Sequence, residues 1–132
     1  MIAHSWGFTP RDFIENVPGA VLIHRVGDGE ILFANGNTVS LFGCDDFNDF
    51  LKYVGGTYAG VIHPDDHQRV RDEMAEQNGL EGVDKTDYVS FRIITKQGDV
   101  RNVLQNGHGV MVEGMGEVYY ELIIDIGQHS MT

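Results

Sequence analysis

The carboxyl-terminal part of the chain contains three segments that resemble β-strands and are separated by short turns. The segments are 86–95, 100–112 and 117–127, and the turns between them lie at 96–99 and 114–116. Parallel strands need a long crossover connection, whereas turns this short join neighbouring antiparallel strands. This region therefore predicts an antiparallel sheet, and no other feature limits the possible folds as strongly.

The last segment alternates between an apolar face and a mixed face. The apolar face carries Val118, Tyr120, Leu122, Ile124 and Ile126, and the mixed face carries Tyr119, Glu121, Ile123 and Asp125. Successive side chains of a strand point to opposite faces of its sheet, and antiparallel sheets commonly bury one face. We therefore expect one face to be covered and the other to be partly open or to lie against something.

A strand pair is also expected near the amino terminus. The segments 20–26 and 31–34 are rich in β-forming residues and flank a Gly-Asp-Gly turn at 27–29. Asn35 follows directly and precedes a short helical pattern that ends at Gly43. Asparagine can accept from the free N–H groups of a helix start, and glycine tolerates the positive φ of a helix end. The chain is thus expected to pass from a hairpin straight into a helix.

Further helices are expected over 10–17, 47–54 and 65–77. The first has Phe13, Ile14 and Val17 as its apolar stripe. The last follows His63-Pro64-Asp65-Asp66, where proline lacks an N–H that a first turn does not need. The two carboxylates there favour the positive end of the helix dipole. This segment gives the strongest helix prediction in the chain.

These elements predict an α+β fold, a five-stranded antiparallel sheet with short helices on one face and an amino-terminal helix. The 132 residues suffice for one domain with one core. We expect a single domain over 1–132, with its core at about 13–126 and a lead-in at 1–8. The segment 80–85 is expected to be a loop, and 127–132 the start of a linker.

The charge balance limits the possible partners. The chain carries 9 basic and 20 acidic residues, a formal net charge of −11. Repulsion therefore opposes binding to nucleic acid or to an anionic membrane surface. The single cysteine cannot form an internal disulfide, and no signal peptide or membrane-spanning run of ~20 apolar residues is visible. A cytoplasmic setting without direct membrane contact is expected.

Five stretches in this order resemble the PAS sensory domains, in the form found ahead of bacterial histidine kinases and diguanylate cyclases. The stretches are PGAVLIHRV, EILFAN with SLFG, VIHPDDHQRV, YVSFRIITKQGDVRNV and the closing Asp125-Ile126-Gly127. Two departures are visible. Arg101-Asn102-Val103 stands where many relatives read Arg-Trp-Val, so an aromatic contact is missing, and the closing stretch often reads Asp-Ile-Thr.

The resemblance implies a signal-transduction module that binds an unknown small molecule or partner. It also implies an output domain on the carboxyl-terminal side, outside this chain, to which a packing change is relayed. A second hypothesis is a ligand-free homodimerisation module that pairs through the open sheet face and the amino-terminal helix. A small α+β enzyme is a third hypothesis.

A pocket between the sheet and the short helices is the expected binding site. Its lining is predicted to consist of Phe33, Leu41, Phe42, Phe50, Val54, His67, Val70, Met74, Phe91 and Ile93. The same residues could instead simply fill the core, and the sequence leaves both interpretations open.

The histidines are the candidate ligands for a haem or a zinc ion. His67 shares a helix face with Val70 and Met74, as a haem ligand would, but its neighbours Asp65 and Asp66 favour a solvated or carboxylate-paired histidine. His63 is expected to be a loop residue packing against Pro64. His24 and His108 have no second ligand at zinc spacing. Haem and zinc are therefore disfavoured, and the cofactor is unknown.

Flavin photochemistry and catalysis also lack their sequence signatures. The Asn-Cys-Arg-Phe-Leu-Gln motif of light-sensing relatives is absent, and two acids after Cys44 are expected to raise the pKa of its thiol. Asp65 and Asp66 could act as an acid and a base, but nothing singles out a catalytic pair. The 17 glycines are interpreted as turn residues and not as a phosphate-binding loop. No catalytic residue is predicted.

Overall fold

The computed structural model describes residues 7, 9–78 and 85–127. The elements are α2 (Pro10–Asn16), β1 (Ala20–Arg25), β2 (Ile31–Ala34), α3 (Gly36–Leu41), α4 (Phe47–Val54), the 3₁₀ turns η1 (Tyr58–Val61) and η2 (Pro64–Asp66), α5 (His67–Asn78), β3 (Lys85–Ile94), β4 (Val100–Val112) and β5 (Gly116–Gly127). None of the described helices is long and apolar enough to cross a membrane.

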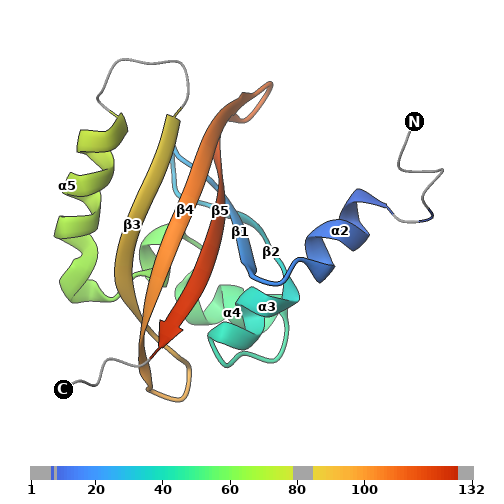
Figure 1. Ribbon diagram of the computed structural model, residues 1–132, viewed down its shortest axis with the longest axis vertical. Helices are drawn as coiled ribbons and strands as arrows, with labels where there is room; N and C mark the ends of the chain where they lie inside the picture. The colour runs from blue at the N-terminus through green and yellow to red at the C-terminus, as the bar shows by residue number, and fades with distance from the viewer. Residues whose placement is uncertain (1–6, 8, 79–84, 128–132) are drawn as a thin grey trace.

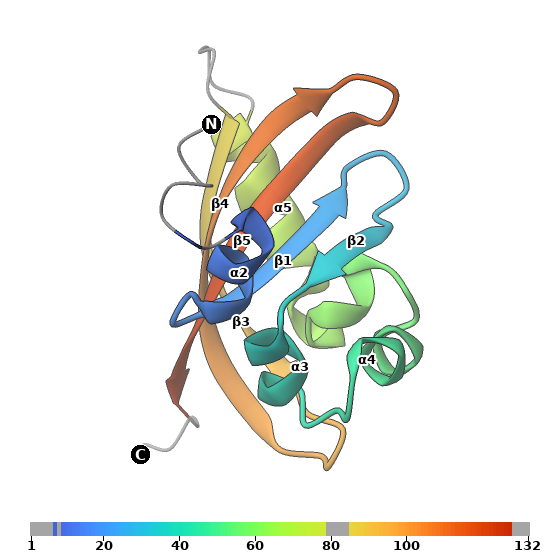
Figure 2. The same ribbon diagram turned by 90° about the vertical axis from the view of Figure 1, so that its right-hand side faces the viewer.

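The five strands form one antiparallel sheet in the order β2-β1-β5-β4-β3. The amino-terminal hairpin therefore docks against the last strand, because β1 pairs with both β2 and β5. Helices α3, α4 and α5 lie on one side of the curved sheet, and α2 stands away from it (Figures 1 and 2). This arrangement confirms the α+β fold class predicted from the sequence.

The two faces of β5 have opposite environments. Tyr119, Glu121 and Ile123 are buried beneath the helices, with exposed fractions of 3%, 1% and 1%. Among the apolar residues of the other face, Val118 is buried, whereas Leu122 and Ile124 remain 36% and 46% exposed. One covered and one open face were expected. The covered face is the mixed one, which carries the buried Glu121.

The local starts and ends of the helices follow from capping. Thr9 and Asp12 form a capping box at α2, and the Asp46 side chain accepts from the backbone N–H of Asp49 at α4. Gly43 and Gly55 have φ of 71° and 77°, as their places after α3 and at the end of α4 require.

Three sequence predictions need correction, and others fall outside the described residues. The segment Pro64–Asp66 is a 3₁₀ turn ahead of α5, and Lys85 belongs to β3. The apolar stripe of α2 does not enter the core, since α2 has no buried residue and Phe13 is 63% exposed. The predictions for 1–6, 8, 80–84 and 128–132 lie outside the described residues.

Asn35 joins the amino-terminal segment to the sheet and to α3. Its side chain is fully buried, and its Oδ1 accepts from the backbone N–H of Val21 at 3.0 Å and from that of Thr38 at 3.1 Å. Its Nδ2 donates to the carbonyl oxygens of Ile14 and Gly19, both at 3.0 Å. The expected helix cap is present, and the same amide also closes the end of the hairpin.

We expect Asn35→Ala to destabilise the protein by about 3 kcal/mol, more than the ~1 kcal/mol of an ordinary cap, because several buried backbone groups lose their partner. Urea unfolding followed by circular dichroism measures the change. Asn37→Ala is the matched control, since Asn37 is exposed and donates to the carbonyl oxygens of Val17 and Gly19. Equal losses in both variants would contradict the central role of Asn35.

Candidate functional site: a cavity beside a buried carboxyl pair

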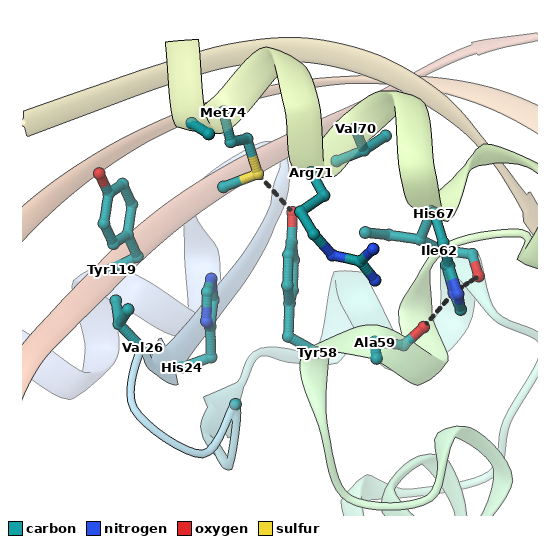
Figure 3. Close-up of a pocket in the computed structure, with 12 residues that line it drawn as sticks. His24, Val26, Tyr58, Ala59, Ile62, His67, Val70, Arg71, Met74 and Tyr119 are labelled. Carbon is teal, nitrogen blue, oxygen red and sulfur yellow. Dashed lines mark hydrogen bonds between the residues drawn. The ribbon is translucent and has the colours of Figure 1, made fainter. Parts of the chain in front are cut away.

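A cavity of about 380 Å³ lies between α5, η1 and the strands β1 and β5 (Figure 3). Its lining consists of His24, Val26, Gly29, Tyr58, Ala59, Ile62, His67, Val70, Arg71, Met74, Ala75 and Tyr119. This volume is within the range of roughly 300–1,000 Å³ that small-molecule sites occupy. The lining is mainly apolar with a few polar side chains, which is typical of such sites.

Helix α5 supplies one wall through residues that recur every three or four positions. His67, Val70 and Met74 follow this spacing and share one helix face, as the sequence indicated. Arg71 and Ala75 also contribute to the lining. One face of α5 therefore forms the wall over most of the length of the helix.

His67 fixes the start of α5 to the loop before it. Its Nε2 lies 2.8 Å from the carbonyl oxygen of Ala59 and 2.9 Å from that of Ile62. A nitrogen between two acceptors carries the proton and donates to them. The ring of the half-buried His67 therefore satisfies local hydrogen bonds to the neighbouring turn, and its hydrogen-bond partners among the described residues are backbone carbonyls and not the expected carboxylates.

The motif at 63–66 anchors the same region to β3. Asp66 is buried and forms a two-point ion pair with Arg92, at 2.6 Å and 3.1 Å, and also accepts from the backbone N–H of Arg92 at 2.8 Å. The hydrogen bonds from Arg92 lower the pKa of Asp66 to about 2. His63 caps the 3₁₀ turn, where its Nδ1 accepts from the backbone N–H of Asp65 at 3.0 Å. Asp66 is thus an anchoring residue.

The opposite wall begins with two stacked rings. His24 of β1 and Tyr58 of η1 are nearly parallel, with ring centroids 4.0 Å apart and an interplanar angle of 3°. The hydroxyl of Tyr58 donates to Oε1 of Gln105 on β4 at 2.9 Å. Burial raises the pKa of Tyr58 well above its ordinary value, with Glu121 and Asp87 adding to the shift. Tyr58 therefore remains a neutral donor.

Behind these rings, two carboxyl groups meet across a glycine. Asp87 of β3 and Glu121 of β5 both pair with Gly107 of β4 in the sheet. A Cβ at Gly107 would lie 1.8 Å from Oε1 of Glu121 and 2.8 Å from Oδ2 of Asp87. The missing side chain provides the space that these two oxygens occupy. Both oxygens are buried, and neither accepts from any other donor among the described residues, so a proton held between them would satisfy both. Both acids are 1% exposed.

The contacts of the pair assign its protons. His24 Nε2 lies 2.9 Å from Oε2 of Glu121, and Nε2 of Gln105 donates to Oδ1 of Asp87 at 3.2 Å. A protonated Asp87 donating to a Glu121 carboxylate satisfies both contacts, with His24 neutral and donating through Nε2. The carboxyl pair, His24, Gln105 and Tyr58 then form one hydrogen-bonded and stacked cluster, which we call the polar cluster.

Burial determines the ionisation of the polar cluster. Desolvation raises the pKa of Asp87 to about 8, with the charge of Glu121 as the next cause, and raises that of Glu121 to about 7. Desolvation also lowers the pKa of His24 to about 4, against the opposing effect of Asp87. Each shift favours the uncharged form of a group that is removed from water.

The cavity contains only part of the lining expected from the sequence. His67, Val70 and Met74 line it. Phe42, Phe50, Val54, Phe91 and Ile93 lie instead in the hydrophobic core, each at most 5% exposed. Leu41 and Phe33 do not line the cavity either, since Leu41 packs against the core and Phe33 borders a separate hollow near α3. The core interpretation therefore describes the position of these residues except Phe33.

The residues of the polar cluster were not singled out in the sequence. His24 and Glu121 are 97 positions apart, and only the sheet brings them into contact. Gly107 and Gly109 are not turn residues, since both lie inside β4 and leave room for the side chains of Glu121 and Tyr119. The sequence signal for this cluster was Glu121, an acid in an alternating strand, together with Gly107 inside the neighbouring strand.

The described residues contain no group of three or more side chains that could hold a metal ion. Burial raises the pKa of the Cys44 thiol, with the charge of Asp49 adding to the effect, in the direction expected from the sequence.

No protein-family model and no curated protein matches the chain. Solved structures do match it. A PAS domain from Colwellia psychrerythraea is 15% identical with a TM-score of 0.73, over 96% of this chain and 98% of that one. A PAS domain of a two-component sensor histidine kinase is 11% identical with a TM-score of 0.68, over 95% and 99% of the two chains.

A third match is the PAS domain, in complex with ethanol, of a LuxR-family transcriptional regulator from Burkholderia thailandensis. It is 14% identical with a TM-score of 0.66, over 90% of this chain and 98% of that one. Together with the strand order and the helices on one sheet face, these matches show that the chain has the PAS fold.

The carboxyl pair should make stability fall as the pH rises from about 6.5 to 8. The folded pair holds its protons up to pKa values of about 7 and 8, whereas unfolded Asp and Glu lose theirs near pH 4. The opposite effect of His24, whose pKa falls from 6.5 to about 4, acts mainly between these two values and therefore below most of this window. We expect a loss on the order of 1 kcal/mol, measured by urea unfolding at several pH values.

Glu121→Gln should flatten this pH dependence, because the amide can still accept from His24 and can donate to an ionised Asp87. Glu113→Gln is the matched control, since Glu113 is exposed in the turn between β4 and β5. A wild-type protein with constant stability across this window would contradict the assignment of a shared proton.

Proposed function

We propose that the chain is a sensory signalling module that binds a small molecule in the cavity and relays a change in packing to an output domain outside it. The observation that supports this most directly is the mixed lining of the 380 Å³ cavity between α5 and the sheet. The proposal gives the chain no catalytic step. It treats residues 13–126 as one sensory domain in the cytoplasm, followed by a linker.

The known proteins with this fold support a sensory role. One matching domain comes from a two-component sensor histidine kinase, and another, from a transcriptional regulator, was solved with ethanol bound. A small molecule and an output domain are therefore compatible with this fold. The cavity of the present chain offers comparable chemistry, namely apolar side chains with a few hydrogen-bonding groups.

The proposed relay runs through β5. Tyr119 lines the cavity, and Glu121 two residues further on belongs to the polar cluster. The strand then continues to Gly127, at the far end from the β4–β5 turn. A ligand that prefers one position of Tyr119 or His24 would bias the packing of β5, and the linker after Gly127 would carry that bias onward.

Filling the cavity should remove a bound small molecule. Native mass spectrometry of gently purified protein is expected to show a bound species, and Ala75→Trp should abolish it, since Ala75 lines the cavity from α5. Glu76→Trp is the matched control on the next helix position, because Glu76 is exposed and is not part of the lining. The ligand-binding proposal fails if the wild type carries no small molecule and a metabolite screen gives no thermal shift.

A second candidate function is a homodimerisation module. It is favoured by the open sheet face, where Tyr88, Tyr120, Leu122, Ile124 and Ile126 are between 36% and 62% exposed. A contiguous apolar surface of this kind commonly serves as a protein interface. Two copies could pair through this face and through Phe13 of α2.

Leu122→Glu with Ile124→Glu should convert such a dimer to a monomer, because it places two charges in the interface. Sedimentation velocity measures the mass. The control is Met111→Glu, in which an even more exposed apolar residue near the β4–β5 turn is changed. A wild-type monomer at all concentrations, or a double variant that remains dimeric, would rule out pairing through this face.

A further inference from the structure

Arg71 points from α5 into the space over the cavity. Figure 3 shows its guanidinium between the rings of Tyr58 and His67, facing the backbone of η1 near Ala59. Its hydrogen-bond partner among the described residues is Oε1 of Gln68, at 3.1 Å from Nη1. An arginine has five N–H donors, so this contact uses only part of the donor capacity of Arg71.

Arg71 differs from the other arginines of the chain in its ion pairs. Arg11, Arg25, Arg69, Arg92 and Arg101 each pair with at least one carboxylate. No carboxylate among the described residues pairs with Arg71, although the chain has 20 acidic residues and only 9 basic ones. Within the described part of the chain, Arg71 is therefore the one arginine without a carboxylate partner, and it lies at the cavity.

The described lining of the cavity carries the positive charge of Arg71 and no carboxylate. Among the twelve described lining residues, Arg71 is the one arginine, and none is Lys, Asp or Glu. The acids Asp87 and Glu121 are not part of this lining. In a protein with a net charge of −11, this lining offers an anion a locally favourable site.

The rest of the lining fits an apolar group. Val26, Ile62, Val70 and Met74 contribute aliphatic and thioether surface, and Tyr119 contributes an aromatic ring. Val70 and Ile62 are buried, at 2% and 6% exposure, whereas Arg71 is exposed to solvent at the edge. The apolar end of a ligand therefore belongs inside and its charged end beside Arg71.

We propose that the cavity binds a small organic carboxylate, with its apolar body against Ile62, Val70 and Met74 and its carboxylate on the guanidinium of Arg71. This inference rests on the proposed ligand-binding function and specifies the chemical class of the ligand. Guanidinium and carboxylate form paired, charge-assisted hydrogen bonds, which are stronger than the bonds to a neutral amide. The carboxylate is thus the group that the site selects.

The test compares benzoate with benzamide and hexanoate with hexanamide, because each pair differs in charge and hardly in shape. Carbon-13 NMR of the methionine methyl groups follows binding at pH 7. The Met74 methyl group reports on the cavity, and that of Met111, which is 77% exposed on β4, is the internal control. We expect both carboxylates to shift the Met74 signal with at least about tenfold higher affinity than their amides.

Arg71→Gln should remove the preference for the carboxylates, and Arg71→Lys should retain part of it, because lysine keeps the charge but not the paired geometry. Arg69→Gln is the matched control, since Arg69 is on the same helix, pairs with Glu73 and does not line the cavity. It should leave the preference unchanged.

Amides that bind as tightly as the carboxylates, or a carboxylate preference that survives Arg71→Gln, would overturn this inference and leave the ligand-binding function intact. If none of the four compounds shifts the Met74 signal, the carboxylate inference also fails. The proposed function itself fails only if native mass spectrometry and metabolite screening find no ligand of any class.

Discussion

The site depends on the close approach of two acids across one strand. Glu121 and Asp87 can meet only because Gly107, between them in the sheet, has no side chain. Their shared proton keeps a buried pair from carrying two charges, which would be far more costly in a region without water. Through His24, Gln105 and Tyr58, the pair links four strands to the 3₁₀ turn that borders the cavity. Cavity and sheet are therefore parts of one hydrogen-bonded structure.

The helical side of the cavity is held by a different set of contacts. Asp66 binds Arg92 of β3 through its carboxylate, and His67 donates to the carbonyl oxygens of Ala59 and Ile62. These contacts fix the start of α5 and leave the surface between α5 and β1 unfilled. The cavity therefore lies between two walls that are each anchored by their own hydrogen bonds.

Strands, helices and their ends were predictable because they depend on neighbours in the chain. Asn35 and Gly43 have the roles that their positions indicated, and the antiparallel sheet follows from the short turns. The polar cluster was not predictable in this way, because His24 and Glu121 are 97 positions apart and meet only through the sheet. Whether Phe91 fills the core or His67 borders a cavity depends on how side chains pack, which periodicity does not specify.

Strand β5 has a consequence for how a signal can leave the domain. Tyr119 borders the cavity, and its neighbour Tyr120 is 44% exposed on the opposite face. Because adjacent residues of a strand share one backbone, the strand cannot rotate about its axis on one face alone. A twist that repositions Tyr119 must also reorient Tyr120 and Leu122. A ligand in the cavity would therefore change the arrangement of the apolar side chains on the open face of the sheet.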